Sequence, residues 1–163
     1  MIKSTLTLAG LCAALMLSAG DVIFADGKLD GKAGKGVTLA DNALTWTFQP
    51  KQAPLTLSPA DGNFAPYNAI EITFDASRAG DKAVIVLVSN PEGAKDFNYY
   101  GAYQKIEKQG VQTWTIPFKS FWVARKPLGW DKISSLQIGF EGWDLKTEPG
   151  LTLKIQSIKL IKQ

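Results

Sequence analysis

The sequence predicts an all-β protein, a two-sheet antiparallel β-sandwich, and three observations support this fold class. Apolar residues recur with a period of two through most of the chain after residue 43. Short stretches rich in Gly, Pro, Asn and Asp separate these runs, as turns separate strands. No stretch of ten or more residues after residue 26 has an apolar stripe with helical spacing. About eight short strands in one domain are typical of a sandwich.

The predicted strands follow one another from residue 43. The expected ranges are 43–48, 55–58, 69–75, 83–89, 97–104, 111–118, 133–141 and 151–162. Ile70, Ile72 and Phe74 alternate with polar neighbours, which is the pattern of a half-buried strand. The 83–89 run is apolar on both faces, so we expect it to lie centrally, with its outer face covered by a second layer or by a loop.

Two positions predict irregularities in this pattern. Pro117 cannot donate a backbone hydrogen bond, so its strand is expected to end at a sheet edge or a bend. In the last run the apolar register changes by one position between Ile155 and Ile158. This change predicts a β-bulge near Gln156 and Ser157.

The first 25 residues have the pattern of a secretory signal peptide, because Lys3 precedes an apolar run that is too short to span a bilayer. Cleavage before Asp26 is preferred to cleavage before Asp21, since the stretch that follows Ala25 is typical of a mobile start. The prediction is a secreted or periplasmic protein in which residues 26–163 form one domain.

Composition excludes several classes of function. The chain has no histidine and a single cysteine, Cys12, which lies in the predicted signal peptide. Leu11 precedes it where a lipidation signal needs a small residue, so no membrane anchor is expected after cleavage. A thiol nucleophile, a serine–histidine triad, disulfides and the usual zinc sites are thereby excluded. The 18 basic and 15 acidic residues are scattered and the net charge is +3, so nucleic acid is not an expected partner.

A series of motifs in the second half of the chain carries a family resemblance. The motifs are Trp114-Thr-Ile-Pro-Phe118, Phe121-Trp122, Gly129-Trp130-Asp131 with Ile133, Leu136 to Phe140, and Leu151 to Leu160. Over roughly residues 66 to 161 this series resembles the galactose-binding-like jelly rolls of carbohydrate-binding modules and of non-catalytic domains attached to polysaccharide lyases and glycoside hydrolases. The resemblance implies a jelly-roll sandwich that binds a polysaccharide or oligosaccharide.

The stretch after residue 118 carries the first candidate ligand-binding residues, Trp122, Arg125 and Lys126. Loops at the rim of a rigid sandwich commonly carry function. An exposed indole can stack on a sugar ring, and Arg can form a bidentate pair with a carboxylate or sulfate. The combination favours an acidic polysaccharide. The alternative is that Trp122 turns inward beside Phe121 and that the cations only solubilise the surface.

Tyr99 and Tyr103 share one face of a predicted strand and form a second candidate, an aromatic platform. The alternative for both tyrosines is that the ring only packs against neighbouring strands and the hydroxyl is solvent-exposed. Trp130 is also a candidate ligand-binding residue, although its place just before a strand suits an aromatic that closes the end of the core. The same core-closing role is expected of Trp143.

Three classes of function remain. A glycan-binding module that is not an enzyme is preferred, and a structural or protein-interaction role in the envelope is the alternative. A minimal polysaccharide lyase or glycosidase is the third class. Without histidine, its acid–base chemistry falls to carboxylates such as Glu141 and Asp144, or to Tyr99 or Tyr103 acting with Arg125.

No cofactor is expected from the sequence, and structural calcium is left open. Asp30, Asp41 and Asp75 are candidate calcium ligands without the spacing of a known loop. Relatives often carry an acidic pair in the last strand, where this chain has Gln156 and Ser157. The resemblance therefore carries over no acidic site at that position, and it leaves the oligomeric state open.

Overall fold

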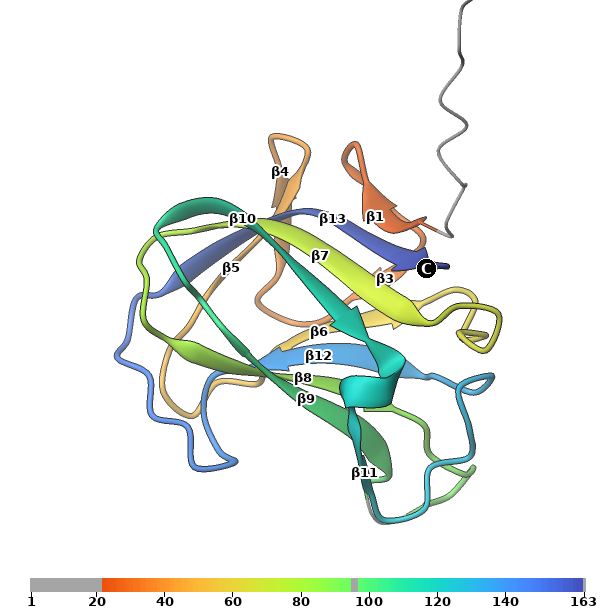
Figure 1. Ribbon diagram of the computed structural model, residues 1–163. Coiled ribbons are helices and arrows are strands. Elements are labelled where there is room, and N and C mark those ends of the chain that lie inside the picture. The colour runs from red at the N-terminus through yellow and green to blue at the C-terminus, as the bar shows by residue number, and fades with distance from the viewer. Residues whose placement is uncertain (1–21, 95–96, 163) are drawn as a thin grey trace, which may run out of the picture.

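The protein is a sandwich of two antiparallel β-sheets (Figure 1). The computed structural model describes residues 22–94 and 97–162. In chain order the strands of these ranges are β1 (Val22–Ala25), β2 (Lys28–Leu29), β3 (Gly31–Ala33), β4 (Thr38–Ala40), β5 (Ala43–Thr47), β6 (Leu55–Pro59), β7 (Ala69–Ala76), β8 (Lys82–Val88), β9 (Tyr99–Lys105), β10 (Gly110–Pro117), β11 (Trp122–Ala124), β12 (Ser135–Gly139) and β13 (Thr152–Ile161). A 3-10 turn, η1 (Phe118–Ser120), joins β10 to β11.

The two sheets form separate layers. Sheet A has the order β10-β7-β13-β1-β2, and β5 pairs with both β13 and β4. Sheet B has the order β11-β9-β8-β12-β6-β3. Figure 1 shows the long strands of sheet A above those of sheet B, with the chain crossing between the layers several times. The predicted all-β, two-sheet antiparallel sandwich is therefore confirmed.

Alternating apolar residues build the core between the sheets. Ile70, Ile72 and Phe74 of β7 are fully buried on the inner face of sheet A, and Leu136 and Ile138 of β12 meet this core from sheet B. Each fully buried side chain of this kind contributes about 1.5–3 kcal/mol. All eight predicted strands are present, with ends that differ by one or a few residues.

Both predicted irregularities are confirmed. The pairing of β13 with β7 shifts register between Ile155 and Ser157, which lets the apolar side chains on both sides of the shift face the core. β10 is an edge strand of sheet A and ends at Pro117. Because Pro117 lacks a backbone N–H only at the end of this edge strand, no hydrogen bond of the sheet is lost there.

Residues 22–42 differ from the prediction, because β1 lies within the predicted signal peptide, and β2 and β3 lie where a mobile start was expected. β1 pairs with β13, and its Phe24 is fully buried in the core. These strands have only two to four residues and β3 and β4 are exposed, so they leave no apolar periodicity in the sequence.

This arrangement bears on the predicted cleavage site. Cleavage before Asp26 would remove β1 and its buried Phe24 from sheet A, whereas cleavage before Asp21 would keep them. The predicted signal sequence before Val22 lies outside the described residues, and its cleavage stays a prediction.

Candidate functional site

The outer face of sheet B, which points away from the core, has an apolar floor. Three outward-facing valines of β8 form it, Val84, Val86 and Val88, and each is at most 3% exposed. Tyr99, Trp122 and Leu145 pack over them. Leu145 belongs to the connection between β12 and β13, so a loop covers part of this face. The prediction that β8 is covered on both sides is confirmed.

Four aromatic side chains gather over this floor, and we call them the aromatic face: Tyr99, Tyr103, Trp122 and Trp143. The ring centroids of Tyr103 and Trp122 are 4.8 Å apart, with an angle of 38° between the planes. Tyr99 and Trp143 meet edge to face, with centroids 6.1 Å apart. Tyr103 is 51% exposed and Trp143 is 37% exposed, so ring surface remains open to solvent.

Two glycines make room for the two indoles. Gly101 lies opposite Trp122 in the β9–β11 pairing, and a Cβ at this glycine would stand 2.3 Å from Cζ2 of Trp122. A Cβ at Gly139 would stand 3.5 Å from Cζ3 of Trp143 and 3.2 Å from Cγ1 of Val84. Neither glycine has a positive φ, so space for the ring is the reason for glycine here.

Trp143 sits in a tight turn with unusual backbone angles. Its φ is +49° and that of Asp144 is +63°, as in a type I′ turn, and the Leu145 amide donates to the Gly142 carbonyl at 2.8 Å. A bulky residue is rarely found in this left-handed region, and the strain costs about 1–3 kcal/mol.

Hydrogen bonds from β9 hold this strained turn over the sheet. The Trp143 indole N–H donates to the Tyr99 hydroxyl at 2.8 Å, and the Tyr103 hydroxyl donates to the Trp143 carbonyl at 3.1 Å. One loop residue is thus attached to both tyrosines of the aromatic face. The orientation of Trp143 is fixed by the fold.

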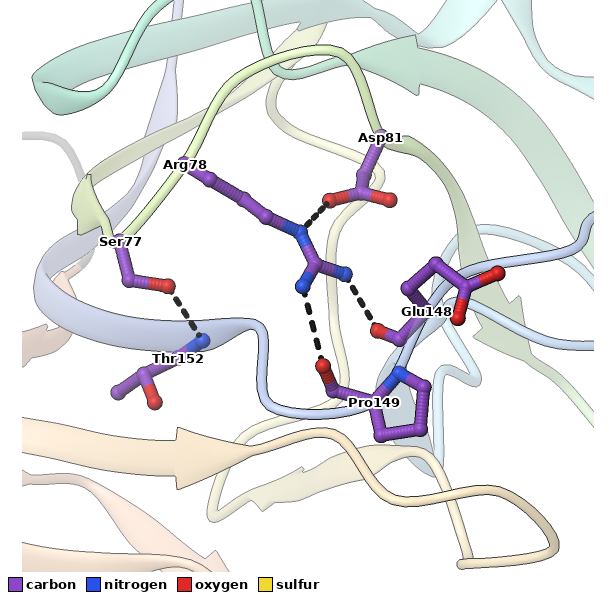
Figure 2. Close-up of polar contacts among 6 residues, drawn as sticks. All are labelled: Ser77, Arg78, Asp81, Glu148, Pro149 and Thr152. Atoms are coloured by element: carbon purple, nitrogen blue, oxygen red, sulfur yellow. Dashed lines mark hydrogen bonds and ion pairs between the residues drawn. The ribbon is translucent and has the colours of Figure 1, made fainter.

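Arg78 fastens the other end of the same loop (Figure 2). Its Nε donates to Oδ2 of Asp81 at 2.7 Å, which holds the guanidinium in place. Nη1 then donates to the Pro149 carbonyl at 3.0 Å, and Nη2 donates to the Glu148 carbonyl. The turn between β7 and β8 therefore anchors the β12–β13 loop where it returns to sheet A.

Two hollows flank Trp143. The first has a volume of about 320 Å³ and is lined by Gln52, Phe97, Gln137 and Glu141 among others. It also includes Trp46, which is buried and whose indole N–H has no hydrogen-bond partner among the residues that the structure describes. The second hollow, of about 460 Å³, is lined by Lys82, Tyr103, Gln104, Lys105, Trp143, Asp144 and Leu145.

No protein-family model matches the sequence, and no curated protein matches it. Solved structures, however, match most of the chain. The family 30 carbohydrate-binding module of a cellulosomal cellulase of Clostridium thermocellum superposes with a TM-score of 0.60 at 11% identity, covering 87% of this chain and 96% of that one. The chain has the jelly-roll fold of carbohydrate-binding modules.

Two further carbohydrate-binding modules show the same fold. The family 11 module from Clostridium thermocellum, in complex with a β-1,3-1,4-mixed-linked tetrasaccharide, has a TM-score of 0.56 at 15% identity, covering 84% of this chain and 91% of that one. A mutant of a family 29 module has a TM-score of 0.56 at 14% identity, covering 87% and 91%. At these identities the similarity establishes the fold alone.

Within the carbohydrate-binding-module fold, three of the predicted ligand-binding residues lie together. Tyr99, Tyr103 and Trp122 all belong to the aromatic face. Trp122 is half-buried on the outer side of sheet B, whereas the preceding Phe121 is buried in the core. The alternative in which Trp122 turns inward beside Phe121 is therefore wrong.

Arg125 and Lys126 lie at one end of the aromatic face. Ala124 pairs with Tyr99, and the two basic residues follow in the turn after β11 with exposed side chains. The Lys126 amide donates to the Asn98 side-chain oxygen at 3.1 Å, which fixes the backbone of this turn. Both cations thus flank the Tyr99 end of the face.

Trp130 is separated from the other candidates. Tyr100 and Phe118 stack on its indole nearly parallel, with centroids 4.0 Å and 4.3 Å away, and the ring packs against the core. This placement agrees with the core-closing interpretation, because its stacking surface is used within the protein. Burial, with a smaller effect of the Asp131 carboxylate, raises the pKa of the stacked Tyr100 above 10.0.

The core-closing role expected of Trp143 is wrong, since this residue lies on the outer face of sheet B. β12 ends at Gly139, and the loop then turns back over the sheet instead of crossing the end of the core. Strand periodicity carries no information on the direction of such a loop. The sequence did offer one signal, the small residue Gly139 at the end of β12, opposite Val84 of β8.

Metal binding has no support in the part of the chain that the structure describes. There, no group of three or more His, Cys, Asp or Glu side chains is placed to hold a metal ion. Asp30 lies between β2 and β3, Asp41 follows β4 and Asp75 lies in β7, and they do not form such a group.

Within residues 22–94 and 97–162 no helix is long and apolar enough to cross a membrane.

Proposed function

We propose that this protein binds glycans without cleaving them, and that the aromatic face is the binding surface. One observation carries the proposal: four aromatic rings lie together on one side of sheet B, partly exposed and fixed by the fold. Aromatic rings combine apolar contact area with a polar atom, which suits the apolar C–H faces and hydroxyls of sugars. A fixed arrangement also lowers the entropy lost on binding.

The hollows beside Trp143 supply polar partners next to the rings. Gln52 and Gln137 line the first hollow, and amide side chains can both donate to and accept from sugar hydroxyls. Binding sites are commonly apolar surfaces with a few polar groups that fix the orientation of the ligand. The first hollow has this composition.

The geometry supports binding over hydrolysis. A glycosidase needs two carboxyl groups about 5–10 Å apart across one sugar bond. Glu141 lines the first hollow and Asp144 the second, with Trp143 between them. Glu141 also accepts a hydrogen bond of 2.7 Å from the Lys51 amide. The two carboxylates therefore do not face each other across one cleft.

A lyase site is also disfavoured. A tyrosine that acts as base or acid needs its hydroxyl free to reach the substrate. The Tyr99 hydroxyl accepts from Trp143, and the Tyr103 hydroxyl donates to the Trp143 carbonyl. The Tyr103 hydroxyl proton and the Tyr99 hydroxyl oxygen are thus both used in contacts that hold the loop.

The finer parts of the proposal concern charge and location. Arg125 and Lys126 flank the Tyr99 end of the face, and cations there would favour acidic polysaccharides. The apolar segment after Lys3 supports export to the periplasm or beyond, where a glycan ligand is encountered.

The test is calorimetric titration of the purified protein with a panel of neutral and acidic polysaccharides. Trp143→Ala and Tyr103→Ala are each expected to weaken binding about tenfold or more, as expected for aromatic anchors at a binding surface. Tyr67→Ala is the matched control, because it removes a half-buried ring outside the aromatic face. If the folded protein binds no member of the panel, the proposal fails and a protein-interaction role takes its place.

A further inference from the structure

We infer that the second hollow is a subsite for an anionic sugar, in which Lys82 and Lys105 bind the carboxylate of a uronic acid. The inference rests on the proposed function, because Tyr103 and Trp143 belong both to this hollow and to the aromatic face. It narrows the acidic polysaccharide of that proposal to one that contains uronic acid, and it adds Lys82 and Lys105, which the sequence did not single out.

The two lysines are direct cross-strand neighbours. Lys82 pairs with Lys105 in the register of β8 and β9, and both line the second hollow. Directly opposite side chains have Cβ atoms about 4.5–5.5 Å apart, and like charges at that separation destabilise a sheet. An anion bound between the two ammonium groups would replace this repulsion with attraction.

The existing partners of the lysines are weak competitors for such an anion. Nζ of Lys105 is 3.4 Å from Oε2 of Glu107, and the two side chains are 51% and 70% exposed. An exposed pair of this kind contributes about 0–1 kcal/mol and is readily exchanged. Among residues 22–94 and 97–162 no ion pair joins Lys82, and Asp144 is the one acidic residue that lines the hollow.

An aromatic ring lies beside the cations at the spacing of one sugar residue. Tyr103 precedes Lys105 by two positions on β9, so both point to the outer side of sheet B, roughly 7 Å apart along the strand. A pyranose stacked on Tyr103 would place a carboxylate on its ring within reach of the lysines. A single uronic acid residue can both stack on Tyr103 and present its carboxylate to the lysines, whereas a neutral sugar can only stack on Tyr103.

This subsite is distinct from the basic turn after β11. Val84 pairs with Tyr103 and Val88 with Tyr99, so Lys82 and Lys105 flank the Tyr103 end of the face, while Arg125 and Lys126 flank the Tyr99 end. Substitutions at the two ends therefore separate their contributions to binding.

The test compares a homogalacturonan oligosaccharide with the same oligosaccharide after full methyl esterification, by calorimetry at several salt concentrations. The Lys82→Gln/Lys105→Gln double variant is expected to lose about tenfold or more in affinity for the acid, since two charge-assisted contacts are removed. Its affinity for the ester should stay unchanged. Lys154→Gln, on the outer side of sheet A, is the control. The pair Arg125→Gln/Lys126→Gln measures the separate contribution of the Tyr99 end of the face.

Five results would overturn the inference, and the last of them is distinguishable because it also overturns the proposed function. Equal affinity for acid and ester, or an unchanged affinity of the double variant for the acid, removes the subsite while leaving glycan binding intact. If only the Arg125→Gln/Lys126→Gln variant loses affinity for the acidic oligosaccharide, the carboxylate is bound at the Tyr99 end of the face. If a sulfated polysaccharide without uronic acid binds as tightly through the same lysines, the hollow binds anions in general and is not specific for a uronate. No binding of any glycan overturns the proposed function itself.

Discussion

The indole nitrogen of Trp143 donates a 2.8 Å hydrogen bond to the hydroxyl oxygen of Tyr99, and the two rings meet edge to face. This contact joins the β12–β13 loop to the first residue of β9. Together with the bond from Tyr103 to the Trp143 carbonyl, it holds an exposed indole at one position above the sheet. Contacts within the protein therefore hold the rings of the aromatic face in place, and under the proposed function this would lower the entropy lost when a glycan binds.

Tyr99→Phe tests this arrangement, since it keeps the ring and removes the oxygen that accepts from Trp143. The indole N–H can then turn to water, so the free energy of unfolding should fall by only about 0.5–1.5 kcal/mol. Glycan affinity should fall severalfold because Trp143 is no longer held. Calorimetric titration and denaturant melts measure the two effects. An affinity equal to that of the wild type would show that the hydrogen bond does not position the indole.

Gly101→Ala should displace Trp122 from the aromatic face. The new methyl group would stand 2.3 Å from Cζ2 of the indole, and such overpacking costs about 1–3 kcal/mol. Gly139→Ala is the milder matched change, because its nearest atoms are 3.2 Å and 3.5 Å away. Glycan affinity should therefore fall more in Gly101→Ala than in Gly139→Ala. The opposite order would refute the role given to Gly101.

The sequence predicts the core of this protein well because the core is periodic. Most of the eight predicted strands follow from alternation, and their inward residues, such as Ile70 and Phe74, are fully buried. The strands that the sequence did not predict, β1 to β4 and β11, have two to four residues each. Alternation needs more residues than that to be recognised.

The candidate site was predictable only where it lies on a long strand. Tyr99 and Tyr103 follow from the period of β9, and Trp122 from its place beside a turn. Trp143 depends on a loop that folds back over sheet B, and its left-handed φ depends on hydrogen bonds to residues far away in the sequence. Lys82 and Lys105 become neighbours only through strand pairing. No local pattern records such long-range contacts.

Arg78→Lys should loosen the β12–β13 loop without unfolding the protein. A lysine keeps the charge but cannot donate at once to Asp81, Pro149 and Glu148 as the guanidinium does. Hydrogen exchange of the Leu145 and Gly150 amides should speed up. Amides in the middle of β7 serve as the internal control and should keep their protection. Unchanged exchange in the loop would show that Arg78 does not anchor it.

Tyr100 should make stability depend on pH in the alkaline range. Its pKa in the folded protein is raised above 10.0, mainly by burial, so the unfolded chain ionises at this residue first. The contribution is fully present below pH 10 and is lost as the pH rises from there through the folded pKa. Denaturant melts between pH 8 and pH 11 should show a smaller decline for Tyr100→Phe than for the wild type. Identical declines would contradict the raised pKa.

The boundary of the folded domain can be tested at β1. Phe24 is fully buried and pairs with Ile158 of β13, so Phe24→Ala should destabilise the protein by about 3–5 kcal/mol. Val22→Ala is the matched control in the same strand, because Val22 is 44% exposed and should cost far less. A chain that begins at Asp26 lacks the whole strand and should lose at least as much stability as Phe24→Ala, as measured by thermal and denaturant unfolding. Equal stability of chains that begin at Asp21 and at Asp26 would show that β1 contributes nothing to the sandwich.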